Sequence, residues 1–344
     1  MTIASSKWLA RTGILGAGAI LALNLIAAPA ARAEDKTFVM KLSLATINDT
    51  QHEWFKRFAA AVERDSGGRI KGQIYPASQL GPIPRQIEGV QFGSIQAYMG
   101  PPEFLVGVDA RYEALSAPGL FSSTDQAVRV INDPAVQNLM FGLGEKKGLV
   151  GVAFAPIGPS SIVTKGELRR LADFSGKKIR VLASPFQLEM VRRMGASPIA
   201  MTLGDVLPAL QQGTIDGALG AIIVWTTFQY QDATKYVVVN EQPYLNSIIV
   251  MSKKWLASLP PDLQKIVHDD AAKTSQDIVP FVKEFVAKQY DVWQSRGGVL
   301  IKFPPDEQAA MLAKISTIAE DLSRDKPELN AAVKLVLESA QRNK

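Results

Sequence analysis

Apolar runs alternate with amphipathic stretches along most of the chain, which is the pattern of an α/β protein. In the first half, the periodicity predicts alternating strands and helices at 38–46, 52–65, 71–75, 84–92 and 95–99. In the second half it predicts a helix at 205–212 and an apolar strand at 215–223. The alternation favours an α/β fold over an all-helical one.

The junction between a predicted helix and the following strand has a similar sequence in both halves of the chain. In one, Gly93 ends the helix and Ser94-Ile95 starts the strand, and in the other Gly213 and Thr214-Ile215 do the same. Each glycine stands where a helix ends in the left-handed region. The match is either a chance likeness between common junctions or a sign of two βα units that face each other across a cleft.

A strand is predicted at 243–252 and a long helical stretch at 262–296, in which Pro280 predicts a kink. A helix of this length would span two lobes. The tail, 305–342, is helical with a break at Pro327. We expect lobe I to comprise 34–157 and 246–285, and lobe II 158–245 and 286–344, because the mature chain exceeds what one core usually serves.

The first 33 residues are predicted to form a cleaved signal peptide. Lys7 and Arg11 precede an apolar segment at 13–28, and Ala31-Arg32-Ala33 forms a small-x-small cleavage site. A lone membrane anchor is the less favoured alternative, since the segment is short and rich in Gly and Ala. The expected location is the periplasm.

Loss of the leader lowers the net charge of the protein. The whole chain has 38 Lys and Arg against 33 Asp and Glu, and three of the basic residues lie in the leader, so 35 basic residues remain against 33 acidic ones. No basic cluster with interleaved aromatic residues occurs, so no nucleic-acid partner is expected. The chain has no cysteine, which excludes thiolate chemistry.

The residues offer no specific catalytic pattern. Beyond the leader the histidines are His52 and His268, and no His-x-x-x-His, Gly-x-Ser-x-Gly or phosphate-binding glycine motif occurs. We therefore expect no enzyme activity, no metal and no cofactor. An exported enzyme that uses carboxylates alone stays an open alternative of another class.

Arg180 is the main candidate for binding. It alternates with Ile179 and Val181 in a short predicted strand, so its side chain lies on the opposite face from theirs. At the end of a strand in an open α/β sheet, that face looks into the crevice where ligands bind. A guanidinium matches a carboxylate bidentately. A surface arginine or a structural ion pair is the alternative.

Tyr98, Phe186 and Trp225 are aromatic candidates near the same strand ends, and each is either a core residue or a wall of the cleft. Gly100 and Gly220 complete the expected set of ligand-contacting residues.

Several ordered motifs carry a resemblance to a known family. They are Tyr75-Pro76-Ala77-Ser78-Gln79-Leu80-Gly81, Pro118-Gly119-Leu120-Phe121, Gly176-Lys177-Lys178-Ile179-Arg180-Val181, Met194-Gly195-Ala196-Ser197-Pro198, Ala209-Leu210-Gln211-Gln212-Gly213-Thr214-Ile215-Asp216-Gly217 and Leu259-Pro260-Pro261-Asp262-Leu263-Gln264. In this order they resemble the solute-binding subunits of tripartite ATP-independent periplasmic (TRAP) transporters.

The resemblance implies a two-lobed periplasmic binding protein fold, with β-strand hinge crossovers and a long helix that spans the lobes. It implies an organic acid as ligand, Arg180 as the carboxylate clamp, and the integral membrane subunits of the transporter as partners. A monomer is expected. A subunit of an ATP-driven importer or a chemoreceptor ligand presenter is the alternative within binding proteins.

The chain departs from the family pattern at three places. Gly220 stands where sialic-acid-type members have a ligand-contacting asparagine, and Leu219 stands where metal-assisted members have a glutamate. The stretch 155–161 lacks the second arginine of many members. These departures predict a monocarboxylate with an apolar or aromatic remainder, packed by residues such as Trp225 and Phe186.

Overall fold

The computed structural model describes residues 36–344. The predicted signal peptide, 1–33, lies outside the described residues. Among the helices at 36–344, none combines the length and the apolar character that a membrane crossing requires.

The strands form a mixed sheet of two halves that share one long strand, β4 (Leu149–Thr164). In the first half the order is β2-β1-β3-β9-β4, with bounds Ile70–Tyr75, Phe38–Leu44, Ala97–Gly100 and Tyr244–Ser252 for the first four strands. In the second half the order is β4-β7-β5-β6, with bounds Gly217–Ala221, Lys178–Val181 and Ser197–Ala200 for the last three. Two further strands, β8 (Tyr236–Val238) and β10 (Val299–Ile301), extend from the other edge of β4.

Strand direction sets where the two halves meet. β1 pairs in parallel with β2 and β3, and β5 pairs in parallel with β6 and β7. β4 and β9 pair antiparallel with each other, and β4 continues from β9 to β7 and β8. The two halves are therefore linked by extended strands that cross between them.

Helices cover the first half of the sheet on one face. α1 (Thr50–Asp65) and α9 (Pro261–Asp277) pack there around a core of large apolar side chains that includes Trp54, Phe55 and Leu263. Asp49 caps α1, because its carboxylate accepts a hydrogen bond of 3.0 Å from the backbone N–H of His52.

A second group of helices packs on the opposite face of the sheet from α1 and α9. They are α2 (Ile83–Phe92), α3 (Thr124–Ile131), α4 (Pro134–Gly142) and α5 (Pro185–Arg193), with the 3₁₀ helices η1 (Pro102–Leu105) and η2 (Ala110–Ser116). The tail adds α11 (Pro305–Ile315), α12 (Ile318–Ser323) and α13 (Pro327–Arg342). The helices not yet named are α6 (Leu203–Gln212), α7 (Ile222–Thr227), α8 (Lys253–Ser258), η3 (Glu145–Lys147), η4 (Leu171–Phe174) and η5 (Tyr230–Asp232).

The repeated junctions have the predicted geometry. α2 ends at Gly93 with a φ of 83°, and α6 ends at Gly213 with a φ of 75°. Both lie in the left-handed region, where a residue with a Cβ atom is strained. The prediction of two glycine-stopped helices is confirmed.

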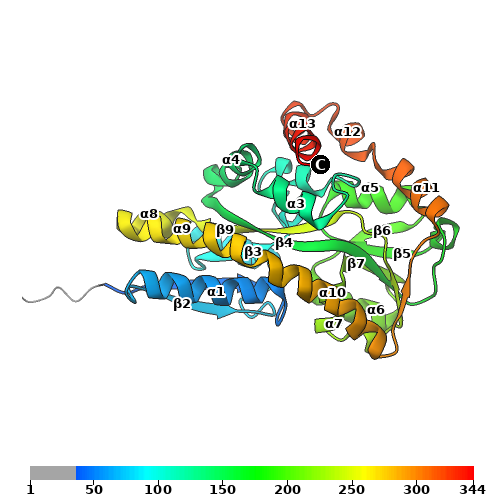
Figure 1. The fold of residues 1–344 in the computed structure, drawn as a ribbon, viewed down its shortest axis with the longest axis horizontal. Helices are drawn as coiled ribbons and strands as arrows, with labels where there is room; N and C mark the ends of the chain where they lie inside the picture. The colour runs from blue at the N-terminus through cyan, green and yellow to red at the C-terminus, as the bar shows by residue number, and fades with distance from the viewer. Residues whose placement is uncertain (1–35) are drawn as a thin grey trace, which may run out of the picture. The chain divides into compact units, whose positions relative to one another are not determined.

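The long helical stretch is confirmed with its kink. α9 ends at Asp277 and α10 (Val279–Ser295) begins two residues later, so the break falls at Ile278. Pro280 causes it, since proline has no N–H to donate to the preceding turn. α9 lies against α1 and α10 against α7, so the pair runs from the first half of the sheet to the second (Figure 1).

The predicted strand at 215–223 needs a correction. β7 ends at Ala221, and Ile222 and Ile223 form the first turn of α7. Both isoleucines are fully buried in the second core, beside Trp225 and Trp293. A continuous apolar run does not distinguish a buried strand from a buried helix, which is why the boundary was misplaced.

The tail contacts both halves of the molecule. α12 packs against α5, whereas α13, which starts with Pro327 in its first turn, packs against η2, α3 and α4 (Figure 1). The segment expected in lobe II therefore also touches elements expected in lobe I. The lobe bounds stay a prediction.

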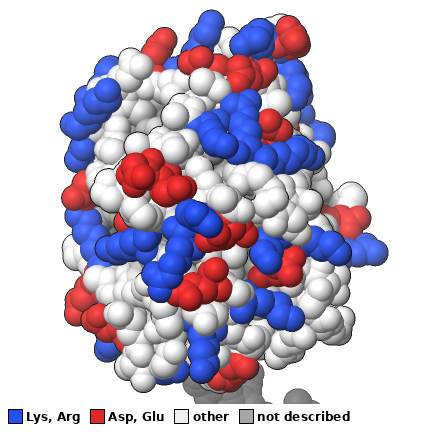
Figure 2. Space-filling view, turned by 90° about the vertical axis from the view of Figure 1, so that its right-hand side faces the viewer, with Lys and Arg blue, Asp and Glu red and all other residues white. Residues whose placement is uncertain are grey.

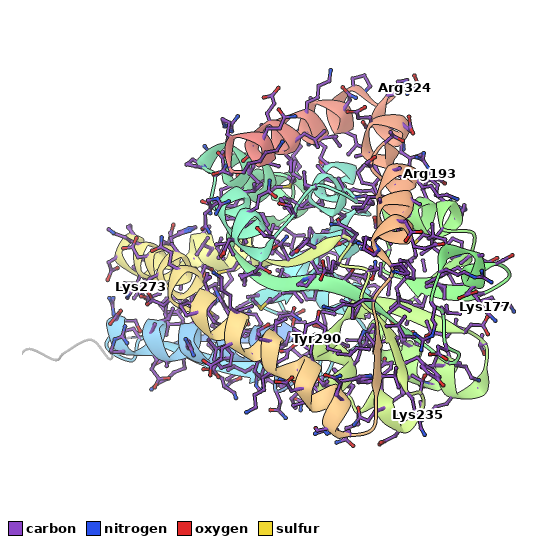
Figure 3. The ribbon with its side chains drawn as sticks, turned by 45° about the vertical axis from the view of Figure 1, so that its right-hand side comes forward. Lys177, Arg193, Lys235, Lys273, Tyr290 and Arg324 are labelled. Carbon is purple, nitrogen blue, oxygen red and sulfur yellow. The ribbon has the colours of Figure 1, made fainter. Side chains whose placement is uncertain are left out.

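Charged side chains cover the surface in mixed order. Blue and red residues are interspersed over the face in Figure 2, without a large area of one sign. Exposed lysines such as Lys235 and Lys273 lie at the edge of the molecule (Figure 3).

Candidate functional site

A cavity lies where the carboxyl ends of the parallel strands of both halves converge. Its lining residues come from the ends of β1, β3, β5 and β7, together with α7 and single residues of β4 and β9. Its volume is about 50 Å³. Open α/β sheets bind ligands at this edge, so the position agrees with the predicted crevice.

Among the described residues, 36–344, Arg180 is the one charged residue that lines the cavity. Its side chain is held by two backbone carbonyls: Nε donates to the oxygen of Met201 and Nη1 to that of Leu219, each at 2.9 Å. Within residues 36–344, no carboxylate forms an ion pair with Arg180 and no group accepts a hydrogen bond from Nη2. The guanidinium is therefore oriented on one side and open on the other.

Burial makes this guanidinium unusual. Arg180 is only 2% exposed, and burial lowers its pKa to about 10, against smaller opposing effects of Tyr230 and Glu103. It is still charged at neutral pH. A buried charge without a partner is costly, and an anionic ligand at Nη2 would remove that cost.

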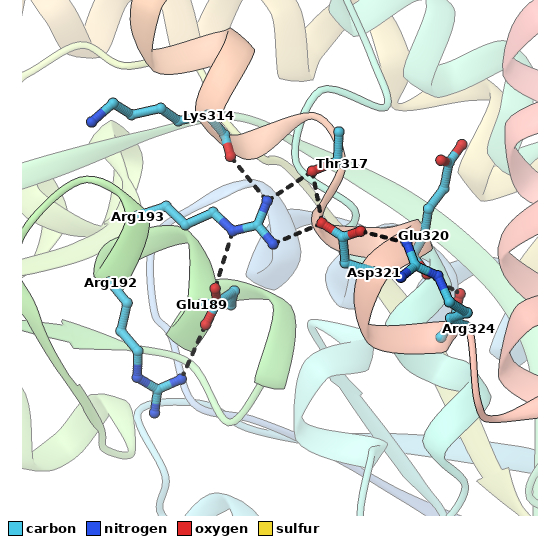
Figure 4. Close-up of polar contacts among 9 residues, drawn as sticks. Glu189, Arg192, Arg193, Lys314, Thr317, Glu320, Asp321 and Arg324 are labelled. Carbon is cyan, nitrogen blue, oxygen red and sulfur yellow. Dashed lines mark hydrogen bonds and ion pairs between the residues drawn. The ribbon is translucent and has the colours of Figure 1, made fainter.

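Arg193 is a structural arginine whose hydrogen-bond partners differ from those of Arg180. It lies at the end of α5 and bonds Glu189 at 3.0 Å, Asp321 at 2.9 Å and Thr317 at 2.8 Å, which ties α5 to α12 (Figure 4). Two carboxylates satisfy its charge. Arg180 has no such pairing in the described part of the chain, so its alternative reading as a structural ion pair finds no support.

Trp225 and Gly220 form one wall of the cavity. The Trp225 indole is fully buried, and its Nε1 donates to Ser161 Oγ at 3.0 Å. A Cβ atom added at Gly220 would lie 2.7 Å from both Cζ2 and Cη2 of this ring. The indole thus occupies the space that an asparagine side chain would need at position 220.

Tyr98 and Gly100 form the opposite wall in a similar way. A Cβ atom at Gly100 would lie 2.1 Å from the Tyr98 hydroxyl oxygen. That hydroxyl is buried and has no hydrogen-bond partner within 36–344. Burial, with the charge of Glu103, raises the pKa of Tyr98, so the phenol stays protonated and can donate a hydrogen bond.

Phe186 is the one predicted site residue that the structure does not bring to the cavity. It lies in the first turn of α5, where its ring is fully buried in the core with Met190. Its backbone N–H donates to the carboxylate of Glu113. Phe186 therefore does not line the cavity in this structure, and its contact with a ligand stays a prediction.

Sequence reasoning missed two buried carboxyl groups beside the site. Glu103 in η1 is 2% exposed, and its Oε1 accepts a hydrogen bond from Gln187 Nε2 at 3.0 Å. Glu113 in η2 accepts from Ser184 Oγ at 2.9 Å and from the start of α5. Burial raises the pKa of each to about 7. No motif marks either residue, because both lie in irregular turns.

Gln51 is a polar residue of the first half whose side chain is satisfied within the protein. Gln51 lines the cavity from the start of α1 and accepts a hydrogen bond from Ser247 Oγ at 2.8 Å. In the described residues, His, Asp and Glu form no cluster that could hold a metal ion. The arrangement can bind an anion.

Comparison with known proteins places the chain in a family. Residues 43–325 match the model of the bacterial extracellular solute-binding protein family 7. The chain is 27% identical over 322 residues to the C4-dicarboxylate-binding periplasmic protein of Rhodobacter capsulatus, covering 91% of this chain and 94% of that protein.

Solved structures share the fold. The sugar acid binding protein of Advenella mimigardefordensis, in complex with galactonate, has a TM-score of 0.85 at 21% identity, covering 90% of this chain and 99% of that one. A TRAP periplasmic solute-binding protein of Desulfovibrio salexigens, with bound orotic acid, has a TM-score of 0.84 at 22% identity, covering 90% and 100%. The predicted two-lobed α/β fold is confirmed, and the chain belongs to the family 7 solute-binding proteins of TRAP transporters.

Proposed function

We propose that the chain is an extracytoplasmic binding protein that captures a monocarboxylate with an apolar remainder and delivers it to the membrane subunits of a TRAP transporter. The observation that carries the proposal is Arg180, a buried guanidinium with one open side and no internal carboxylate partner. It fits one carboxylate, bound bidentately or through Nη2.

The rest of the cavity supports an apolar remainder. Ile157, Leu182, Leu203 and Val224 line it, and in the described part of the chain its polar lining is limited to Thr46, Gln51 and Tyr98, with Arg180 as the one charged residue. A second carboxylate, as in the C4-dicarboxylates that the Rhodobacter relative is named for, would be buried without a cation. The hydroxyl groups of a sugar acid would also lose hydrogen bonds against these walls.

The cavity volume favours a small acid. About 50 Å³ on this measure holds roughly four water molecules, which together occupy about 120 Å³ as liquid. A small monocarboxylate with a branched or an aromatic remainder is of this size. Location in the periplasm and action as a monomer are part of the proposal.

Thermal-shift and calorimetric screening of the mature protein tests the ligand class. The panel contains isobutyrate, isovalerate, benzoate, succinate and galactonate. Short branched monocarboxylates should raise the Tm and bind, and succinate should not. Tight binding of succinate or galactonate without binding of any monocarboxylate would refute the proposal.

The transport role has its own test. Neighbouring genes for two integral membrane subunits without an ATPase fit a TRAP system, whereas a neighbouring ATPase gene favours an ATP-driven importer.

A further inference from the structure

A buried hydrogen-bonded chain connects Glu103 with the cavity wall. Glu103 lies between two cavity-lining residues, Pro101 and Phe104, and its Oε1 accepts from Gln187 Nε2 at 3.0 Å. Gln187 Oε1 in turn accepts from the backbone N–H of Leu182 at 3.1 Å, and Leu182 lines the cavity just after β5. The carboxyl is thus held directly behind the strand end that carries Arg180.

The second oxygen of this carboxyl is open. Glu103 Oε2 is buried and has no partner at full hydrogen-bond geometry within 36–344, although the nearby Ser116 hydroxyl of η2 lowers the pKa of Glu103 and so opposes part of the effect of burial. An ionised carboxylate normally accepts several hydrogen bonds, and a buried one with a bare oxygen is costly. A proton on Oε2 removes this cost. The geometry therefore suits a group that binds and releases a proton.

The charges that face Glu103 come from three elements. They are Arg180 on β5, Tyr98 on β3 and Glu113 on η2. Tyr98 stays neutral, and Glu113 disfavours a second negative charge nearby. Arg180 is therefore the one cation among these groups, and ionised Glu103 partly balances its charge when the cavity holds no acid.

Binding of an acid changes this balance. A carboxylate at Arg180 supplies the counter-charge and adds a second negative charge beside Glu103, in surroundings where like charges repel strongly. Two carboxylates that share one site cannot both stay ionised without cost. Glu103 is then expected to take a proton from the solvent.

We propose that Glu103 is a proton-binding site coupled to ligand capture, so that the protein binds an organic acid anion together with one proton. This inference rests on the proposed function, because it requires a carboxylate at Arg180. Since burial already raises the pKa of Glu103 to about 7, the coupling acts near neutral pH.

The pH dependence has a defined direction. A group that is more easily protonated in the complex than in the free protein makes affinity fall as pH rises through its free pKa. Binding should be constant below about pH 6 and approach a tenfold loss per pH unit above about pH 8. The acids of the panel are fully ionised over this range and add no slope.

Calorimetry of isobutyrate binding at pH 6–9, repeated at pH 8 in phosphate and in Tris, tests the coupling. If isobutyrate does not bind, the probe is the panel acid that raises the Tm most. The wild-type protein should take up a proton at pH 8, with about 0.9 proton per bound acid as the upper limit, which is reached when Glu103 is fully protonated in the complex. Glu103→Gln should take up none and lose the slope, because glutamine keeps an oxygen for Gln187 but does not titrate.

Glu113→Gln is the matched control. Glu113 is equally buried, but it bonds Ser184 and the start of α5 and does not contribute to the electrostatics of Arg180. This variant should still take up a proton when it binds the acid, but its affinity should begin to fall at a lower pH than in the wild type, because the charge of Glu113 contributes to the raised pKa of Glu103. A slope that is the same in wild type and in Glu103→Gln would overturn the proposal, even if both bind the acid.

A measurement without ligand separates this inference from the proposed function. The urea midpoints of wild type and Glu103→Gln should diverge between pH 5 and pH 8, with the wild type weaker at high pH, because both proteins ionise Glu113 but only the wild type also ionises the buried carboxyl at position 103. A constant difference between the midpoints would show that Glu103 does not titrate there and would overturn the coupling whatever the ligand is.

Discussion

Replacement of Gly220 by alanine tests how the cavity wall is built. The added Cβ atom would lie 2.7 Å from Cζ2 and from Cη2 of Trp225, whereas relaxed carbon contacts are about 3.5–4.0 Å. The indole must therefore move by about 1 Å. It is fully buried, and the free space beside it is the cavity that it lines, so a shift of the ring either strains the core or narrows the cavity.

The expected cost has two parts. A shift of this size breaks the 3.0 Å hydrogen bond from Trp225 Nε1 to Ser161 Oγ, which is worth about 1 kcal/mol. Overpacking of a close-packed core adds strain, and such changes cost about 1–3 kcal/mol in total. We expect Gly220→Ala to lower the free energy of unfolding by about 2 kcal/mol.

Urea unfolding followed by circular dichroism measures this loss. Gly142→Ala is the control, because an added Cβ there has no atom within 4 Å and the residue ends a helix. It should be neutral or slightly stabilising. In a Trp225→Phe background, which lacks the two clashing atoms, Gly220→Ala should cost little. Equal costs of Gly220→Ala in both backgrounds, or no cost at all, would refute the packing argument.

Three further substitutions have distinct outcomes. Phe186→Leu should lower the Tm but leave the affinity for a bound acid within twofold, since this ring lies outside the cavity; an affinity loss above tenfold at unchanged Tm contradicts its placement. Tyr98→Phe should raise the stability of the ligand-free protein by about 1–3 kcal/mol, because it removes a buried hydroxyl without a partner; a lower urea midpoint would show that the hydroxyl is bonded. Glu113 has a pKa raised to about 7, so the folded state holds its proton more tightly than the unfolded state and stability falls as pH rises from about 4.5 to about 7. Glu113→Gln should flatten the pH profile of unfolding by about 3 kcal/mol over this window, and an unchanged profile contradicts the assignment.

The fold was largely predictable from the sequence because its signals are local. Gly93 and Gly213 each end a helix because glycine adopts the left-handed conformation without strain. Pro280 breaks a helix because its ring leaves the backbone nitrogen without an N–H. The boundary between β7 and α7 was not predictable in this way. There, an apolar run is buried in both conformations, and tertiary packing against α10 decides where the strand ends.

The site was predictable in part, for a related reason. Arg180 alternates with apolar neighbours on a strand, so its face follows from the two-residue period of a strand. Phe186 follows a proline at a helix start, where the sequence does not say which way the ring turns. Glu103 and Glu113 lie in 3₁₀ turns without periodicity, and their burial arises from contacts with α5, distant in the chain.

The affinity of Arg180→Gln for the best monocarboxylate of the panel, measured by calorimetry at pH 6.5, tests the central claim most directly. Arg193→Gln is the matched control, because that arginine is paired with Glu189 and Asp321 away from the cavity. Loss of a buried charge-assisted contact costs about 2–5 kcal/mol, so Arg180→Gln should bind at least about thirtyfold more weakly. Arg193→Gln should bind within twofold of the wild type. An Arg180→Gln variant that binds the acid as tightly as the wild type would contradict the assignment of this guanidinium as the carboxylate clamp.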